Sequence, residues 1–164
     1  MKTNCIFCKI IKGELPASVF YEDNDVLGFM NHKPVHAPEC LFIPKKHIDH
    51  FTDINDKLAA KIMKLAQRLA RQIHKHYKPQ RVGYVVAGYT VSHAHLIVIP
   101  QYHENDITCQ HFAVLKGKKI IFTDEHIPIT PRKKLDEFAA NLKKLMSKKN
   151  KNLQRITARM WGFS

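Results

Sequence analysis

The clearest pattern in this chain is a helical repeat of apolar positions between residues 53 and 77. Apolar side chains recur every three or four residues along one stripe, and lysines and arginines occupy the opposite side. The stripe consists of Leu58, Ile62, Leu65, Ala66, Leu69 and Ile73. Because Asp53 or Asn55 can cap the first turn, the spacing predicts an amphipathic helix that ends near Tyr77.

A second helical pattern follows Thr130 in the C-terminal third. Thr130 can act as the N-cap, and Pro131 suits the first helical position. The apolar stripe of this helix consists of Leu135, Phe138, Ala139, Leu142 and Leu145. Near the other end of the chain, Cys5 to Lys12 is expected to form a short helix or turn, because Gly13 and Pro16 follow it.

Short apolar runs rich in β-branched and aromatic residues predict strands between these helices. They are Val19–Glu22, Val26–Met30, Cys40–Ile43, Arg81–Ala87 and Val91–Pro100. The Asp-Asn-Asp turn at residues 23–25 joins the first two into a hairpin. The short links favour an α+β fold with a mostly antiparallel five-stranded sheet and two main helices. Lys119–Phe122 is a further candidate strand.

The run from Val91 to Pro100 carries two histidines. Alternate side chains of a strand point to opposite faces, so His93, His95 and Ile97 would share one face. Two imidazoles on one face of a sheet are typical of a functional site. The same pattern also fits two half-buried histidines that hydrogen-bond to the backbone, and a short H-x-H motif does not separate these alternatives.

Length and composition are those of one globular domain. The chain has 164 residues, of which 45% are hydrophobic, which is enough for one sizeable core. The first residues do not form an apolar signal sequence, and no segment approaches the roughly 20 apolar residues of a membrane span. We therefore expect a cytoplasmic protein that does not bind membranes.

The chain is strongly basic. Its net charge of +13 arises from 27 lysines and arginines against 14 acidic residues, which favours anionic partners such as nucleotides or RNA. Much of this charge lies late in the sequence, in Arg132–Lys134, Lys143–Lys144 and Lys148–Lys151. Runs of this kind are usually solvated, so RNA is only weakly supported as a partner.

Two of the four cysteines form a C-x-x-C motif at Cys5 and Cys8, whereas Cys40 and Cys109 stand alone. In a reducing compartment this spacing indicates either metal binding or redox chemistry. A redox role is disfavoured, because the motif lies at the extreme N-terminus and does not begin a helix that follows a strand.

Four stretches resemble the histidine-triad family, in the order and spacing of that family. They are residues 5–16 (CIFCKIIKGELP), 21–23 (YED), 43–48 (IPKKHI) and 87–95 (AGYTVSHAH). The likeness covers about residues 5–102. It implies a nucleotide-binding α+β fold, usually a homodimer in which one sheet continues across both subunits.

The resemblance also implies an activity. Family members hydrolyse or transfer nucleoside monophosphates held in phosphoramidate, phosphoanhydride or dinucleoside polyphosphate linkages. The position of the family's nucleophile corresponds to His95, which would form a nucleotidyl-histidine intermediate. A neutral imidazole is a competent nucleophile near pH 7 and needs no metal to activate it.

By the same resemblance, several residues would hold the nucleotide. They are Gly88 and Thr90 at the phosphate, Phe7, Ile10 and Phe29 at the base, and Asn31 at the ribose. Ordinary core packing explains the three apolar residues equally well.

The zinc-carrying branch of the family uses four positions that are all filled here. They are Cys5, Cys8, His47 and His93. A closed set of two thiolates and two imidazoles is typical of a structural zinc site, so the resemblance implies a stabilising ion and not a catalytic one.

Two positions depart from the family pattern. Ile97 stands where the third histidine of the triad is expected, and Glu39 replaces an upstream active-site histidine. Losing one such partner typically costs about 10²–10³ in rate. We therefore expect a nucleotide hydrolase or transferase whose activity is low. The alternative is a catalytically weakened nucleotide- or RNA-binding module with a structural zinc.

The likeness stops before the C-terminal third. We expect residues 1–110 to form the histidine-triad-like nucleotide-binding domain and residues 111–164 to extend it with a strand and a basic helix. Trp161 and Phe163 are candidates for packing on a dimer partner.

Overall fold

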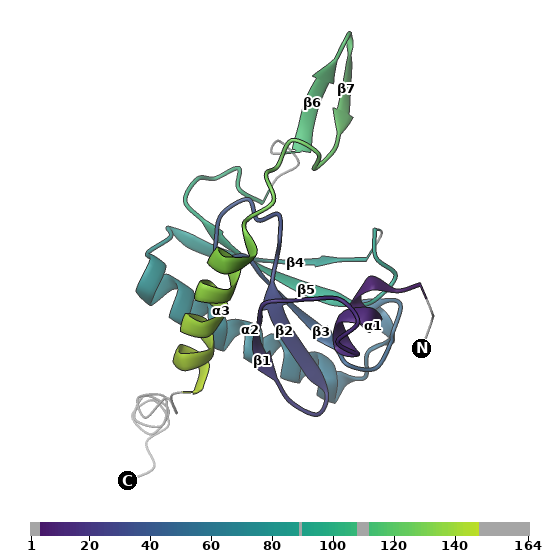
Figure 1. Ribbon diagram of the computed structural model, residues 1–164, viewed down its shortest axis with the longest axis vertical. Coiled ribbons are helices and arrows are strands. Elements are labelled where there is room, and N and C mark those ends of the chain that lie inside the picture. Colours follow the sequence, from purple (N-terminus) through teal and green to yellow (C-terminus); the bar gives the residue numbers. More distant parts are fainter. Residues whose placement is uncertain (1–3, 89, 108–111, 148–164) are drawn as a thin grey trace.

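A computed structural model describes residues 4–88, 90–107 and 112–147 of the chain. Its centre is a five-stranded sheet in the order β1-β2-β3-β5-β4, and every neighbouring pair of strands is antiparallel (Figure 1). The strands are β1 (Val19–Glu22), β2 (Val26–Met30), β3 (Cys40–Pro44), β4 (Arg81–Ala87) and β5 (His95–Gln101). Together with the helices described next, this sheet confirms the predicted α+β fold.

Helix α2 (Asp56–Tyr77) packs against one face of the sheet. Asn55 is its cap, because the side-chain oxygen accepts a hydrogen bond from the backbone N–H of Leu58 at 3.0 Å. Asp53 instead ends a short 3-10 helix, η1 (Phe51–Asp53). The predicted apolar stripe is buried except for Leu58, which is partly exposed, and it forms the main core with Phe20 and Phe42 of the sheet.

Helix α3 (Arg132–Ser147) packs on β1, β2 and α2. It begins one residue later than predicted, because the carbonyl of Pro131 accepts hydrogen bonds from Lys134 and Leu135 at 3.0 and 3.1 Å and thus occupies the capping position. The backbone N–H of Thr130 donates to His32 instead. The buried residues of this helix, which belong to the main core, are Leu135, Ala139, Leu142, Leu145 and Met146.

The opposite face of the sheet is covered in part by α1 (Ile6–Ile11), which ends before Gly13 at a φ of +75°. Phe7 of α1 packs here with alternate residues of β2 and β3. This second cluster consists of Phe7, Leu27, Phe29, Leu41 and Ile43. The candidate site lies on this face, away from α2.

Strand β5 begins at His95, so the prediction of a strand from Val91 is wrong at its start. The backbone N–H of His93 donates to the carbonyl of Val91 at 2.7 Å, and that of Ala94 donates to Ile48 at 2.7 Å. These bonds turn the chain and do not pair it with a neighbouring strand. Strand alternation therefore does not explain why His93 lies near His95.

Two further strands, β6 (Ala113–Lys116) and β7 (Lys119–Phe122), form a separate hairpin that stands clear of the main body (Figure 1). Strand β7 coincides with the predicted strand, whereas β6 was not predicted. Cys109, Trp161 and Phe163 lie outside the described residues. Among the helices that the structure describes, none combines the length and the apolar composition needed to cross a membrane.

Candidate functional site

Four side chains that can bind a metal meet beside α1. Cys5 and Cys8 come from the start of this helix, His47 follows β3, and His93 precedes β5. Their ligand atoms all lie within 4.8 Å of one another. Nδ1 of His93 is 3.5 Å from the sulfur of Cys5 and 3.7 Å from that of Cys8, and Nδ1 of His47 is 3.3 Å from Cys8. The fold thus brings together all four residues predicted as metal ligands.

The protonation of this cluster suits a metal. Nε2 of His93 lies 2.8 Å from the carbonyl oxygen of Pro44 and must donate to it, so Nδ1 presents its lone pair toward the thiols. Burial lowers the pKa of His93 and keeps the ring neutral. Burial, together with the neighbouring Cys5, raises the pKa of the Cys8 thiol. A bound cation would reverse that effect, and a donor set of two thiols and two imidazoles fits zinc.

His95 opens β5 and lies next to this cluster. Its Nδ1 is 2.7 Å from the carbonyl oxygen of His93 and must carry the proton of this hydrogen bond, because a carbonyl only accepts. The other ring nitrogen, Nε2, is therefore left with a lone pair. The side chain is only 6% exposed, and burial lowers its pKa, so the imidazole is neutral near pH 7.

Phe7 connects the two histidines to the second apolar cluster. Its ring centroid lies 5.8 Å from that of His93 and 5.3 Å from that of His95, in edge-on geometry. It also contacts Phe29 at 5.6 Å, and Ile10 packs at the margin of the same cluster. Both phenylalanines are buried, so their packing is accounted for without a nucleotide, and base binding remains a prediction.

Asn31 and Glu39 form a hydrogen-bonded pair where β2 ends and β3 begins. The side-chain amide of Asn31 donates to one carboxylate oxygen of Glu39 at 2.5 Å, and the backbone N–H of Val35 donates to the other at 2.9 Å. Burial raises the pKa of Glu39, and these two hydrogen bonds oppose the rise. Glu39, which departs from the expected family pattern, thus has its carboxylate satisfied in part by Asn31.

The predicted phosphate contacts lie in the turn between β4 and β5. Gly88 and Thr90 are both exposed. Thr90 lines a pocket of about 260 Å³ that is also lined by Cys5 and His47, two residues of the candidate metal site. Ile97, two residues beyond His95, is partly buried in the second apolar cluster. A role for Gly88 and Thr90 at a phosphate stays a prediction.

Residues 12–104 match the family model described as the HIT domain, and this segment is more than half of the chain. The chain belongs to the HIT domain family. This HIT protein is 36% identical over 108 residues to "Protein hit" of Bacillus subtilis, covering 63% of its own length and 74% of the relative's.

Two further comparisons bear on function and fold. The HIT protein is 30% identical over 102 residues to adenosine 5'-monophosphoramidase hnt1 of Schizosaccharomyces pombe, covering 62% of its own chain and 77% of that relative. It also resembles the crystal structure of a zinc-bound histidine triad family protein from Mycobacterium smegmatis, with a TM-score of 0.64 and 24% identity over 93% and 97% of the two chains. The latter likeness shows the shared fold.

The sequence analysis missed one polar cluster of this HIT protein. Nε2 of His36 lies 3.0 Å from one carboxylate oxygen of Asp106. Asp106 is 1% exposed, and its other carboxylate oxygen accepts hydrogen bonds from the backbone N–H groups of Tyr102 and His103 at 2.6 and 2.9 Å. Burial acts to raise the pKa of Asp106, but these hydrogen bonds outweigh it and lower the pKa to about 2. No local motif indicates the pair, because its members come from distant loops.

Proposed function

We propose that this HIT protein cleaves a nucleoside monophosphate from a phosphoramidate, phosphoanhydride or dinucleoside polyphosphate through a nucleotidyl-His95 intermediate. Membership of the family supports nucleotide hydrolase or transferase chemistry, and the relative from Schizosaccharomyces pombe is named as a monophosphoramidase. The observation that carries the proposal is the 2.7 Å hydrogen bond between Nδ1 of His95 and the carbonyl of His93, which leaves Nε2 unprotonated.

The reaction would run in two displacements at phosphorus. Nε2 of His95 attacks the α-phosphorus, and the bond from phosphorus to the leaving group breaks as the N–P bond forms. The leaving group departs with that electron pair and takes a proton from solvent. Water then attacks phosphorus, loses a proton to solvent and displaces Nε2, which regenerates the neutral ring. Throughout, the carbonyl of His93 holds the Nδ1 proton and offsets the positive charge that the ring gains.

We further propose that the substrate lies beside α1. Phe7 supports this position, because its ring borders the nucleophile, and Ile10 and Phe29 extend the same apolar surface toward a base. The backbone at Gly88 and the hydroxyl of Thr90 would meet the phosphate. Asn31 would reach the ribose hydroxyls only after giving up its hydrogen bond to Glu39.

We propose that Cys5, Cys8, His47 and His93 hold a structural zinc ion. The closeness of their ligand atoms supports this, as does the Nδ1 lone pair that His93 presents to the thiols. When bound, zinc would fix the position of His93, and the carbonyl of His93 in turn orients His95. Metal analysis of freshly purified protein should find about one zinc ion per chain. The ion should be lost in Cys8→Ala and retained in Cys40→Ala, a buried cysteine outside the cluster. Zinc-free wild-type protein would contradict the assignment.

A second candidate, a nucleotide- or RNA-binding module with weakened catalysis, has specific support. Ile97 offers no acid–base or charge assistance at the phosphate, and Glu39 places a buried carboxyl where a positive or neutral partner is expected. This alternative requires tight binding of AMP or RNA without turnover, and binding of RNA should weaken steeply with salt.

Turnover of adenosine 5'-phosphoramidate separates the two candidates. We expect His95→Ala to lower kcat/KM by more than ~10³-fold, because the nucleophile is lost. His76→Ala is the matched control, since this histidine is exposed near the end of α2. Equal residual rates in wild type and His95→Ala would refute the hydrolase proposal. Calorimetric binding of AMP without turnover would favour the binding module.

We also propose a cytoplasmic homodimer whose sheet continues through β4. Strand β4 is an edge of the sheet and exposes Tyr84 and Val86, whereas the opposite edge strand, β1, is packed against α3. The free thiols of Cys5, Cys8 and Cys40 fit a reducing compartment.

A further inference from the structure

The hairpin of β6 and β7, residues 113–122 and called the arm from here on, has one wholly apolar face. Directly opposed residues of an antiparallel pair share a face, and the opposed pairs Ala113–Phe122 and Leu115–Ile120 lie on the same one. Leu115, Ile120 and Phe122 are 71%, 66% and 63% exposed. Large apolar side chains therefore cover a face of the arm that the described chain leaves open to solvent.

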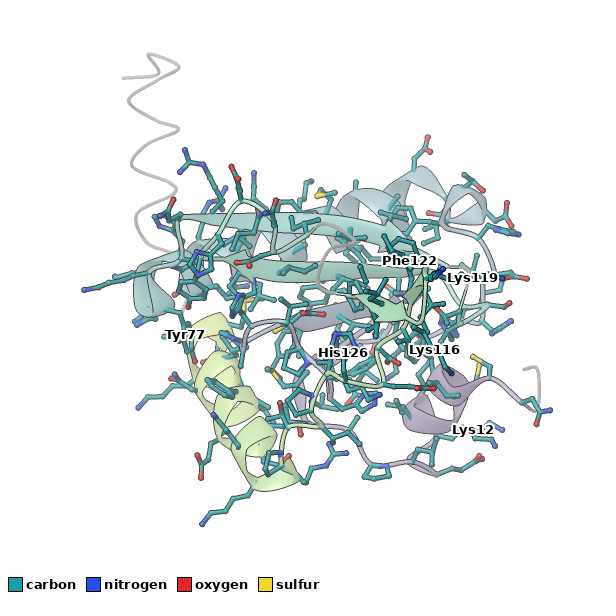
Figure 2. The ribbon with its side chains drawn as sticks, turned by 90° about the horizontal axis from the view of Figure 1, so that it is seen from above. Lys12, Tyr77, Lys116, Lys119, Phe122 and His126 are labelled. Carbon is teal, nitrogen blue, oxygen red and sulfur yellow. The ribbon has the colours of Figure 1, made fainter. Side chains whose placement is uncertain are left out.

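The tip of the arm is cationic. Lys116 pairs with Lys119 at the end of the ribbon, and Gly117, with a φ of +62°, and Lys118 form the turn between them. Figure 2 looks down along the arm from this tip and labels Lys116 and Lys119, the two residues that flank the turn. No acidic residue occurs between Ala113 and Phe122. The arm thus combines one apolar face with a lysine-rich end.

An arm of this kind needs a surface to pack against. A two-stranded hairpin alone is marginally stable in water, because it buries little apolar area. The three large side chains expose on the order of 400 Å² together, a patch size that on monomeric proteins is often functional. The base of the arm is anchored, since Lys33 pairs with Asp124 at 3.4 Å and Thr130 donates to His32 at 2.8 Å.

The position of the arm relative to the sheet indicates where that surface lies. Figure 1 shows the arm rising past β4, and Figure 2 shows it on the side of the sheet away from α2. Beyond β4 this chain supplies no further strand of the five-stranded sheet among its described residues. The arm therefore extends over the space that a second sheet paired with β4 would occupy.

We propose that the arm clasps a second copy of this chain, with its apolar face lying on the partner's sheet beside β4. In a two-fold dimer each copy contributes one arm. Each arm buries roughly 400 Å² of its own and a similar area beneath it, so the two arms together account for about 1,600 Å², the size of a standard stable interface. One arm docked on an unrelated partner would bury only about half of that area.

Other occupants fit the arm less well. Insertion into a membrane from the tip would carry Lys116, Lys118 and Lys119 into the apolar layer first. RNA would use the lysines but would leave Leu115 and Ile120 without a partner, because neither offers a hydrogen bond or a stacking ring. The inference rests on the proposed dimer and is independent of the chemistry at His95.

Sedimentation velocity over a dilution series tests the arm in the full-length protein. We expect Leu115→Ser combined with Phe122→Ser to raise the dimer dissociation constant by about 100-fold or more, as loss of central apolar contacts does. The matched control is Lys116→Ser combined with Lys119→Ser, which changes the other face of the same ribbon and should leave the dimer within a few-fold of wild type. Hydrogen exchange on the wild type needs no variant: amides of residues 113–122 should be protected at dimer concentrations and exchange faster on dilution.

Each other outcome rejects the arm. A wild-type monomer at high micromolar concentration would remove both the dimer and the arm, while turnover by His95 could still be measured. A dimer that both double variants weaken equally, or that neither weakens, would leave the dimer standing and reject the arm. If the apolar variant stayed dimeric but lost binding to phosphatidylserine vesicles or to single-stranded RNA, that ligand would replace the second copy as the occupant.

Discussion

Replacing Gly83 by alanine should destabilise the protein, because the surroundings of β4 leave no room for a side chain there. A Cβ at this position would overlap Cδ1 of Ile107 and would lie 3.1 Å from both Cγ1 of Ile107 and Oε1 of Gln101. Ile107 belongs to the segment that follows β5, and its side chain lies against β4 at Gly83. The added methyl group must therefore turn the isoleucine into another rotamer or push its segment away from the sheet.

The size of the effect follows from two opposing contributions. Overpacking costs about 1–3 kcal/mol, and the lower half of this range applies because Ile107 is only half-buried and its end can rotate. Alanine also stabilises a strand by roughly 0.5–1 kcal/mol relative to glycine, since it restricts the unfolded chain. Gly83→Ala should thus lower the free energy of unfolding by about 1 kcal/mol. Ile107→Val removes Cδ1 and should cost about 0.5 kcal/mol alone.

Urea unfolding of both single variants and the double variant, followed by circular dichroism, measures the coupling. The double variant should be nearly as stable as wild type, with a coupling of about 1 kcal/mol or more, because the valine makes room for the alanine. Gly88→Ala is the control, since no atom lies within 4 Å of a Cβ there. If the two single effects add within about 0.5 kcal/mol, the steric argument is wrong.

Three further predictions concern the cap, a buried carboxylate and the metal cluster. Asn55→Ala should lower the free energy of unfolding by about 1 kcal/mol, because the cap on the N–H of Leu58 is lost; an unchanged urea midpoint would contradict this. Asp106 has a pKa lowered to about 2, so its stabilisation is complete above its unfolded pKa of ~4 and is lost as the pH falls toward 2. The melting temperature of Asp106→Asn should therefore fall less steeply than that of wild type over this pH range. An equally steep fall in the variant would show that the Asp106 carboxylate does not cause it. Chelation should lower the melting temperature of wild type, and adding zinc should restore it. The melting temperature of Cys8→Ala should not change on chelation. An equal response of both proteins would contradict the proposed zinc site.

The elements with strong local patterns were predictable from the sequence. The stripe from Leu58 to Ile73 requires only a helical period and one apolar environment, so α2 follows from spacing alone, whereas the sequence left its cap open between Asp53 and Asn55. The two cysteines of the candidate metal site could be predicted because C-x-x-C is a local motif. The two histidines were predicted from the family resemblance and not from spacing. We propose that residues 1–110 and 111–164 form one domain, because α3 packs into the same core as α2.

The remaining features depend on contacts between distant segments. His93 lies outside β5 because the neighbouring Ala94 bonds to Ile48, and nothing near residue 93 in the sequence indicates that partner. Asn31 and Glu39 meet at the two ends of the β2–β3 connection, and His36 and Asp106 come from two different loops, so neither pair has a recognisable spacing. Strand β6 was not predicted because its four residues carry a weak pattern and pair with β7 in a hairpin that is separate from the main sheet.

The proposed zinc site also implies an order in which its four ligands become available while the chain is synthesised. Cys5 emerges from the ribosome first and His93 follows 88 residues later, with His47 between them. A nascent chain can hold an ion through its thiols early, but the fourth ligand arrives only as β5 itself is being made. If the proposed zinc site is correct, full coordination and the docking of the strand that carries His95 would therefore occur in a single late step of folding.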